Sequence, residues 1–168
     1  MPSKSTLEKA KRDLRAGKQP STAAGEFVRE EVKHIRQGKH GARSPQQAIA
    51  IGLSKARRAG VPLKPPAPGR TSARTRRSAE RAYEVGQGRR PARAPSRRRA
   101  RAVERALERE PRRAASRPAL AQQARRAAAR RSATERKRAA DKAVATKGPR
   151  ARSRAAKRAA RTRRRQRE

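Results

Sequence analysis

The side chains in this sequence that could do chemistry are almost all cations. Its 168 residues include 51 Lys and Arg against 13 Asp and Glu, which gives a formal net charge of +38. Lys and Arg bind phosphate groups, and positive self-repulsion of this size is relieved most simply by a polyanion. The composition therefore predicts a nucleic acid as the partner, with an acidic membrane surface as the main competitor.

Other kinds of reactive site are missing from the sequence. It contains no Cys, which excludes disulfides and thiolate chemistry, and the two histidines, His34 and His40, do not complete a metal site by themselves. There is no phosphate-cradling glycine loop, no nucleophile beside a base and no cluster of carboxylates. We therefore expect a protein that is not an enzyme, with no catalytic residue, cofactor, metal ion or small-molecule substrate.

Membrane insertion is also not expected. The sequence has no run of about 18 apolar residues and no apolar signal-peptide core. Cytoplasm or nucleoid is the expected location.

The cations are concentrated in the C-terminal part of the chain. Residues 1–70 contain 16 basic and 5 acidic side chains, and residues 71–168 contain 35 basic and 8 acidic ones. The aromatic residues are Phe27 and Tyr83, and nearly all bulky apolar residues precede Leu63. A composition of this kind cannot build a core for the whole chain. It predicts a small folded domain at 1–63, a Pro-rich linker at 61–70 and a basic tail at 71–168.

The folded part is expected to be three helices. The best-marked one covers residues 45–58, because Ser44 and Gln47 form a capping box, Pro45 occupies the first helical position and Gly60 suits the end. Apolar residues at helical spacing predict two earlier helices, from Ser5 to the Gly at 17 and from Pro20 to the Gly at 38. The fold class is therefore predicted to be all-α.

The turns (corners) that follow these helices contain glycine beside Lys or Arg, and they allow two interpretations. Arg beside a helix-ending glycine is ordinary helix-dipole chemistry, but such corners could also present backbone and charge to phosphates. The basic loop at 39–43 also has two interpretations: such loops are more often solvated connections, but it could be an anion site beside the next helix N-terminus.

Base-specific recognition is not favoured. Gln46 and Gln47 could pair with adenine at the start of a recognition helix, but the connection at 37–44 is longer than the three or four residues of a helix-turn-helix motif. The Arg-rich segment 88–91 lacks the core of a minor-groove hook, so we interpret it as a basic linker.

The tail consists of Ala/Arg segments at 71–85, 96–110, 119–146 and 150–168, separated by Gly and Pro. Each segment has good helix propensity but almost no apolar face, and like charges one turn apart oppose the isolated helix. We expect a tail that is mostly disordered alone and becomes helical on a polyanion.

Three segments carry a resemblance to known proteins: Pro-Ser-Thr-Ala-Ala-Gly-Glu-Phe-Val at 20–28, Gly-Lys-His-Gly-Ala-Arg-Ser at 38–44, and Gln-Ala-Ile-Ala-Ile-Gly-Leu-Ser-Lys-Ala-Arg-Arg-Ala-Gly at 47–60. Through them, residues 1–63 resemble a family of small bacterial basic proteins that carry a domain of unknown function and are often labelled DNA-binding. The tail is similar in composition to bacterial histone-H1-like proteins, although those are usually Lys-rich. The resemblance implies a nucleoid-associated, histone-like protein and brings no catalytic residue.

The expected function is thus largely sequence-nonspecific binding of duplex DNA. Binding of RNA or the ribosome is the alternative, as is an adaptor whose head binds a protein while the tail holds nucleic acid. The predicted nucleic-acid contacts are cations of helix ends, loops and arginine runs: Lys18, Lys39, His40, Arg43, Lys55, Arg57, Arg58, Arg89, Arg90, Arg97, Arg98, Arg99, Arg125, Arg126, Arg130, Arg131, Arg163, Arg164 and Arg165.

Overall fold

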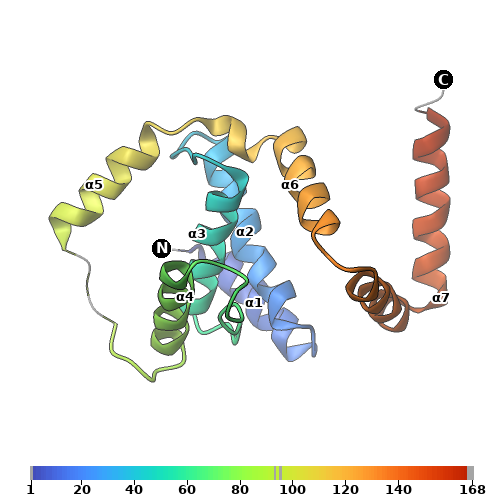
Figure 1. Ribbon diagram of the computed structural model, residues 1–168, viewed down its shortest axis with the longest axis horizontal. Coiled ribbons are helices and arrows are strands. Elements are labelled where there is room, and N and C mark those ends of the chain that lie inside the picture. The colour runs from blue at the N-terminus through green and yellow to red at the C-terminus, as the bar shows by residue number, and fades with distance from the viewer. Residues whose placement is uncertain (1, 93, 95, 166–168) are drawn as a thin grey trace. The chain divides into compact units, whose positions relative to one another are not determined.

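A computed structural model of the protein describes residues 2–92, 94 and 96–165 (Figure 1). In these residues all regular structure is helical, which confirms the predicted all-α class. The elements, in chain order, are α1 (Lys4–Arg15), α2 (Pro20–Arg36), α3 (Pro45–Arg58), α4 (Ala73–Gly86), α5 (Arg97–Glu108), the 3-10 helix η1 (Arg112–Ala115), α6 (Arg117–Ala129) and α7 (Ala133–Arg165).

The helix ends follow the local sequence closely. The Ser44 hydroxyl accepts a hydrogen bond from the Gln47 amide at 3.2 Å, and the Gln47 side chain accepts one from the Arg43 amide, so α3 begins where the capping box predicts. The first helix differs from the prediction, because Ser3 rather than Ser5 caps it. Glu30 explains the difference, since its carboxylate accepts a hydrogen bond from the Ser3 amide at 2.8 Å and holds that residue in place.

The packing of α2 against α3 is the centre of the fold, and α1 also packs on α2. One core cluster surrounds Phe27, which is fully buried together with small residues of α1, α2 and α3. A second cluster surrounds the fully buried Ile35 at the end of α2. At Gly52 the two helices approach so closely that a Cβ would lie 2.7 Å from the Cα of Val28.

Helix α4 packs directly on α3 (Figure 1). Ala79 and Ala82 are its buried residues. The Gln87 side chain donates a hydrogen bond to the Gly60 carbonyl at 3.2 Å, and a Cβ on Gly86 would overlap the Arg57 carbonyl. Because its contact surface is alanine and glycine, α4 docks without the bulky apolar stripe that the sequence analysis required.

Residues 107–115 also dock on the N-terminal helices. The Gly41 amide donates to the Leu107 carbonyl at 2.7 Å, and the Arg36 guanidinium donates to the Ala115 carbonyl at 2.8 Å. Ala114 and Ala115 are buried in the cluster around Ile35. The expected three-helix head followed by a disordered tail is therefore not supported.

By its internal contacts the chain forms two compact units, Met1–Gln123 and Ala124–Glu168. In the second unit none of the described side chains is buried. Ser132 and Glu135 form a capping box at the start of α7, with hydrogen bonds of 3.1 and 3.0 Å. The break predicted at the Gly-Pro pair is present, because Gly148 has φ 63° and ψ 165° inside α7. The predicted division at 61–70 stays a prediction.

Substitution of Gly52 by Ala should destabilise the protein by about 1 to 3 kcal/mol, because the added Cβ meets the Val28 backbone, which cannot move aside cheaply. Gly25 is the matched control, since it lies in α2 with open space around its Cα. Gly25→Ala should stabilise by about 0.5 to 1 kcal/mol through helix propensity. Urea unfolding followed by circular dichroism measures both. Equal stabilisation by the two substitutions would show that α2 and α3 do not cross closely at Gly52.

Candidate nucleic-acid interface

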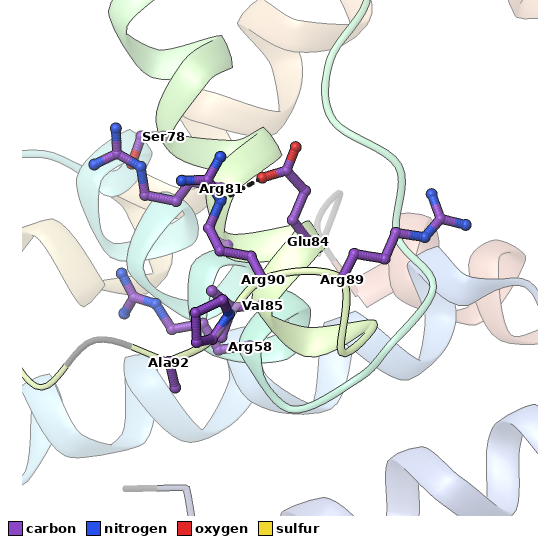
Figure 2. Close-up of a pocket in the computed structure, with 10 residues that line it drawn as sticks. Arg58, Ser78, Arg81, Glu84, Val85, Arg89, Arg90 and Ala92 are labelled. Atoms are coloured by element: carbon purple, nitrogen blue, oxygen red, sulfur yellow. Dashed lines mark hydrogen bonds and ion pairs between the residues drawn. The ribbon is translucent and has the colours of Figure 1, made fainter.

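Four arginines line one open pocket of about 1100 Å³ between the end of α3 and α4 (Figure 2). They are Arg58, Arg81, Arg89 and Arg90, with Glu84 as the acidic residue among the lining side chains. We call this site the arginine pocket. The other lining residues are Ser78, Ala82, Val85, Pro91 and Ala92.

The ends of two helices bring these arginines together. Arg58 is the last residue of α3, and Arg81 lies in the third turn of α4. Gly88, with φ 70°, ends α4, and the Arg89 amide donates to the Glu84 carbonyl at 2.8 Å. This tight helix end brings Arg89 and Arg90 to the lining of the pocket, and Figure 2 shows the Arg89 side chain pointing away from Arg58.

The pocket keeps an excess of positive charge. Glu84 accepts a hydrogen bond from Arg90 Nε at 2.7 Å, and this exposed pair neutralises one of the four cations. Arg58, Arg81 and Arg89 remain exposed. A guanidinium offers a planar fork of donors that matches the oxygens of a phosphate, so the arrangement suits binding of a phosphodiester backbone.

Arg57 does not belong to this surface, although it is a predicted contact. Its side chain is 7% exposed and donates hydrogen bonds to the carbonyls of Leu63 and Lys64, at 3.1 and 3.3 Å. Burial lowers the pKa of this guanidinium from its ordinary value. The residue fastens the Pro-rich segment to α3 and is unavailable to a ligand.

Lys55 and His40 are also directed inward. Both lie against Glu31, which is 1% exposed: Lys55 Nζ is 2.5 Å from Oε2, and His40 Nε2 is 3.2 Å from Oε1. We therefore leave these two residues and Arg57 out of the interface. The side-chain oxygen of Gln47 accepts the Arg43 amide in the cap of α3, so this oxygen is not available to a base.

The remaining predicted cations lie at the surface in several places. Lys18 pairs with Asp13 at 2.6 Å but is 53% exposed, and Lys39 and Arg43 are exposed in the loop after α2. The arginines at 97–99 form the exposed first turn of α5. Exposed arginines of α6, the turn after it and the last turn of α7 make up the rest: Arg125, Arg126, Arg130, Arg131, Arg163, Arg164 and Arg165.

The second half of α7 carries a stripe of cations along one side. Residues that repeat at three- and four-residue intervals lie on one face of a helix. Arg and Lys occupy six such positions, all of them exposed: Arg150, Arg154, Lys157, Arg158, Arg161 and Arg165.

Arg81 and Glu31 are the residues that the sequence analysis missed. Arg81 was overlooked because α4 was expected to pack on nothing. Glu31 precedes His34 by three residues. This Glu-x-x-His spacing places both side chains on one helix face, and it is the signal that could have identified Glu31 as a neighbour of His34.

Comparison with known proteins gives one match. Residues 4–66 match the model of a family described as a family of unknown function, DUF6496. The predicted resemblance to a domain of unknown function is thus confirmed for this part of the chain, which covers α1, α2 and α3. No curated protein and no solved structure matches. Among the described helices, none has the length and apolar character needed to cross a membrane.

Arg57 and Arg58 are adjacent but should respond differently to substitution by Met, which keeps the apolar stem. Arg57→Met removes two hydrogen bonds from a buried charged group and should destabilise the protein by roughly 1.5 to 3 kcal/mol. Arg58→Met should change stability by less than about 0.5 kcal/mol, because Arg58 is exposed. Thermal unfolding of the two variants distinguishes them, and equal losses would contradict the inward position of Arg57.

Proposed function

We propose that this protein is a non-enzymatic, nucleoid-associated protein that binds duplex DNA with little sequence preference, in a histone-like manner. The observation that carries the proposal is the arginine pocket, where three exposed guanidinium groups remain after Arg90 pairs with Glu84. Three such groups on one open surface favour a ligand with several phosphates over a single small anion.

The second unit supports the same partner. Residues 124–168 contain 19 Lys and Arg and 3 Asp and Glu. Cations on exposed helices bind phosphates without reading bases, and counterion release then supplies most of the affinity.

Duplex DNA is favoured over unpaired RNA because the chain offers little aromatic surface. Proteins that hold unpaired bases commonly stack them on exposed aromatic rings. Phe27 is fully buried in the core, and Tyr83 is partly buried in α4. The binding energy must therefore come from the backbone phosphates, which a duplex presents at higher density.

The arginine pocket can be tested by removing three charges at once. The variant Arg58→Gln/Arg81→Gln/Arg89→Gln should weaken binding of a random duplex about tenfold or more and should make the salt slope shallower by up to about 3. Its matched control is Arg97→Gln/Arg98→Gln/Arg99→Gln, which removes the same charge from α5. Because three successive helical residues point in different directions, the control should lose less affinity.

Fluorescence anisotropy with labelled duplexes, at several salt concentrations, measures both variants. Equal losses of affinity in the two variants would show that the arginines of the pocket contribute only as part of the protein's total positive charge. No binding of the wild-type protein to duplexes at physiological salt would overturn the proposed function, and tighter binding of RNA would move it to the RNA alternative.

The salt dependence of the full chain gives a further prediction. If about 8 to 10 phosphates are neutralised, log K against log salt should have a slope of roughly −7 to −9. Truncation after Gln123 should remove a large part of this slope, because the second unit is lost. Duplexes of different sequence should bind within about tenfold of each other. A steep sequence preference with a flat salt response would contradict binding through phosphates.

A further inference from the structure

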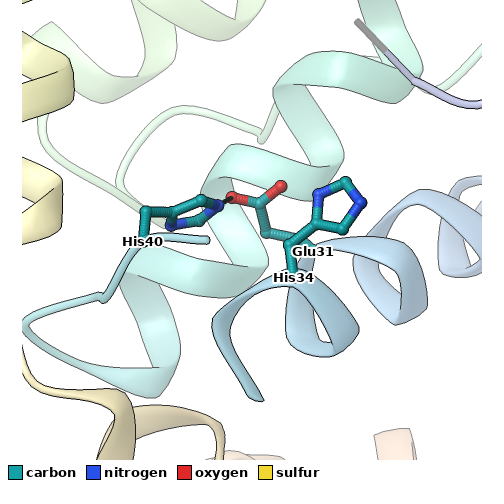
Figure 3. Close-up of side chains that lie close together, drawn as sticks. All are labelled: Glu31, His34 and His40. Atoms are coloured by element: carbon teal, nitrogen blue, oxygen red, sulfur yellow. Dashed lines mark ion pairs between the residues drawn. The ribbon is translucent and has the colours of Figure 1, made fainter. Parts of the chain in front are cut away.

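Three potential metal ligands come together at the end of α2. Glu31 and His34 lie three residues apart on this helix, and His40 follows in the loop that leads to α3. One ligand atom from each residue can be chosen so that all three lie within 4.8 Å of one another. Figure 3 shows the Glu31 carboxylate between the two imidazole rings.

Glu31 is the buried member of this cluster. Its side chain is 1% exposed, and Lys55 binds only one of its oxygens, Oε2. The other oxygen, Oε1, is buried and makes no hydrogen bond, although His40 Nε2 lies 3.2 Å away. A buried carboxylate oxygen without a partner is unfavourable, so its surroundings indicate a missing positive ligand.

The hydrogen bonding of His40 also indicates a missing positive ligand beside Glu31 Oε1. Its Nδ1 lies 3.0 Å from the Gly41 carbonyl, which can only accept, so Nδ1 carries the proton. Nε2 lies 3.2 Å from the buried Oε1, and a proton or a metal ion between the two atoms would make this contact favourable. Histidines that bind metals usually hold the other ring nitrogen to a carbonyl or carboxylate in this way.

The distance between Glu31 Oε1 and His40 Nε2 suits a small tetrahedral ion. Zinc binds imidazole nitrogen and carboxylate oxygen at about 2.0 to 2.2 Å, which puts two ligand atoms about 3.3 Å apart at tetrahedral angles. The 3.2 Å between Oε1 and Nε2 is close to that value. Burial and the nearby Lys39 both lower the pKa of His34 from its ordinary value.

We propose that Glu31, His34 and His40 bind a divalent transition-metal ion, with zinc as the best match, through one carboxylate oxygen and two imidazole nitrogens. Lys55 holds the second carboxylate oxygen, so Glu31 binds through Oε1 alone. Water completes the tetrahedron. The metal ties the loop after α2 to the helix itself, and this role is independent of DNA binding.

The test uses full-length protein without a histidine tag, freed of nucleic acid at high salt. Since the chain has two His and no Cys, no other imidazole or thiolate competes for zinc. Calorimetric titration with Zn²⁺ should give one site per chain, and zinc should raise the melting temperature, because the site forms only in the folded state. Cobalt in the same site should give the visible absorption of a tetrahedral complex.

His34→Gln and His40→Gln should each weaken zinc binding at least about tenfold and abolish the zinc-dependent rise in melting temperature. These variants are preferred to Glu31→Gln, which leaves Lys55 without its buried partner. Glu26→Gln is the matched control, because Glu26 lies on the same helix and pairs with Arg29 at the surface. It should bind zinc as the wild-type protein does.

Two results would overturn the proposal. One is a wild-type protein that binds no zinc at one ion per chain. The other is zinc binding of unchanged affinity in both histidine variants. Either would mean that Glu31 serves to pair with Lys55 and a protonated His40.

Discussion

The close crossing of α2 and α3 is the constraint on which the rest of the structure depends. A chain with two aromatic residues and few bulky aliphatic ones gains little from each side chain that it buries. It compensates by bringing backbones together, as Gly52 does against Val28 and as Gly86 does against the end of α3. Alanine fills most of the buried positions, so the attraction comes from many short contacts between helix backbones.

The same crossing determines which cations are available to a ligand. It places Lys55 of α3 over Glu31 of α2, and it turns Arg57 inward to the carbonyls of the Pro-rich segment. Arg58, one residue later, is then left at the surface beside α4. The helix that organises the core therefore also separates the cations that maintain the fold from those that face outward.

Local signals in the sequence predicted the all-α class, the bounds of α3 and the break at Gly148. They did not predict the docking of α4 or of residues 107–115, because those contacts consist mainly of alanine, glycine and backbone groups, which have no distinctive pattern. Nor could they distinguish Arg57 from Arg58, since the rotation of α3 is determined by tertiary packing. The contact of His40 with Glu31 depends on the loop after α2 folding back on that helix, which no local spacing encodes.

The stripe of cations on the second half of α7 has a geometric consequence. At a rise of 1.5 Å per residue, the segment from Pro149 to Arg165 is about 25 Å long, which is less than one turn of a DNA duplex, about 34 Å. A straight row of charges and a wound row of phosphates remain in register only over part of such a turn. Under the proposed function, the non-helical residue at Gly148 would limit the footprint of each half of α7 to a length over which a straight helix can still follow the pitch of a duplex.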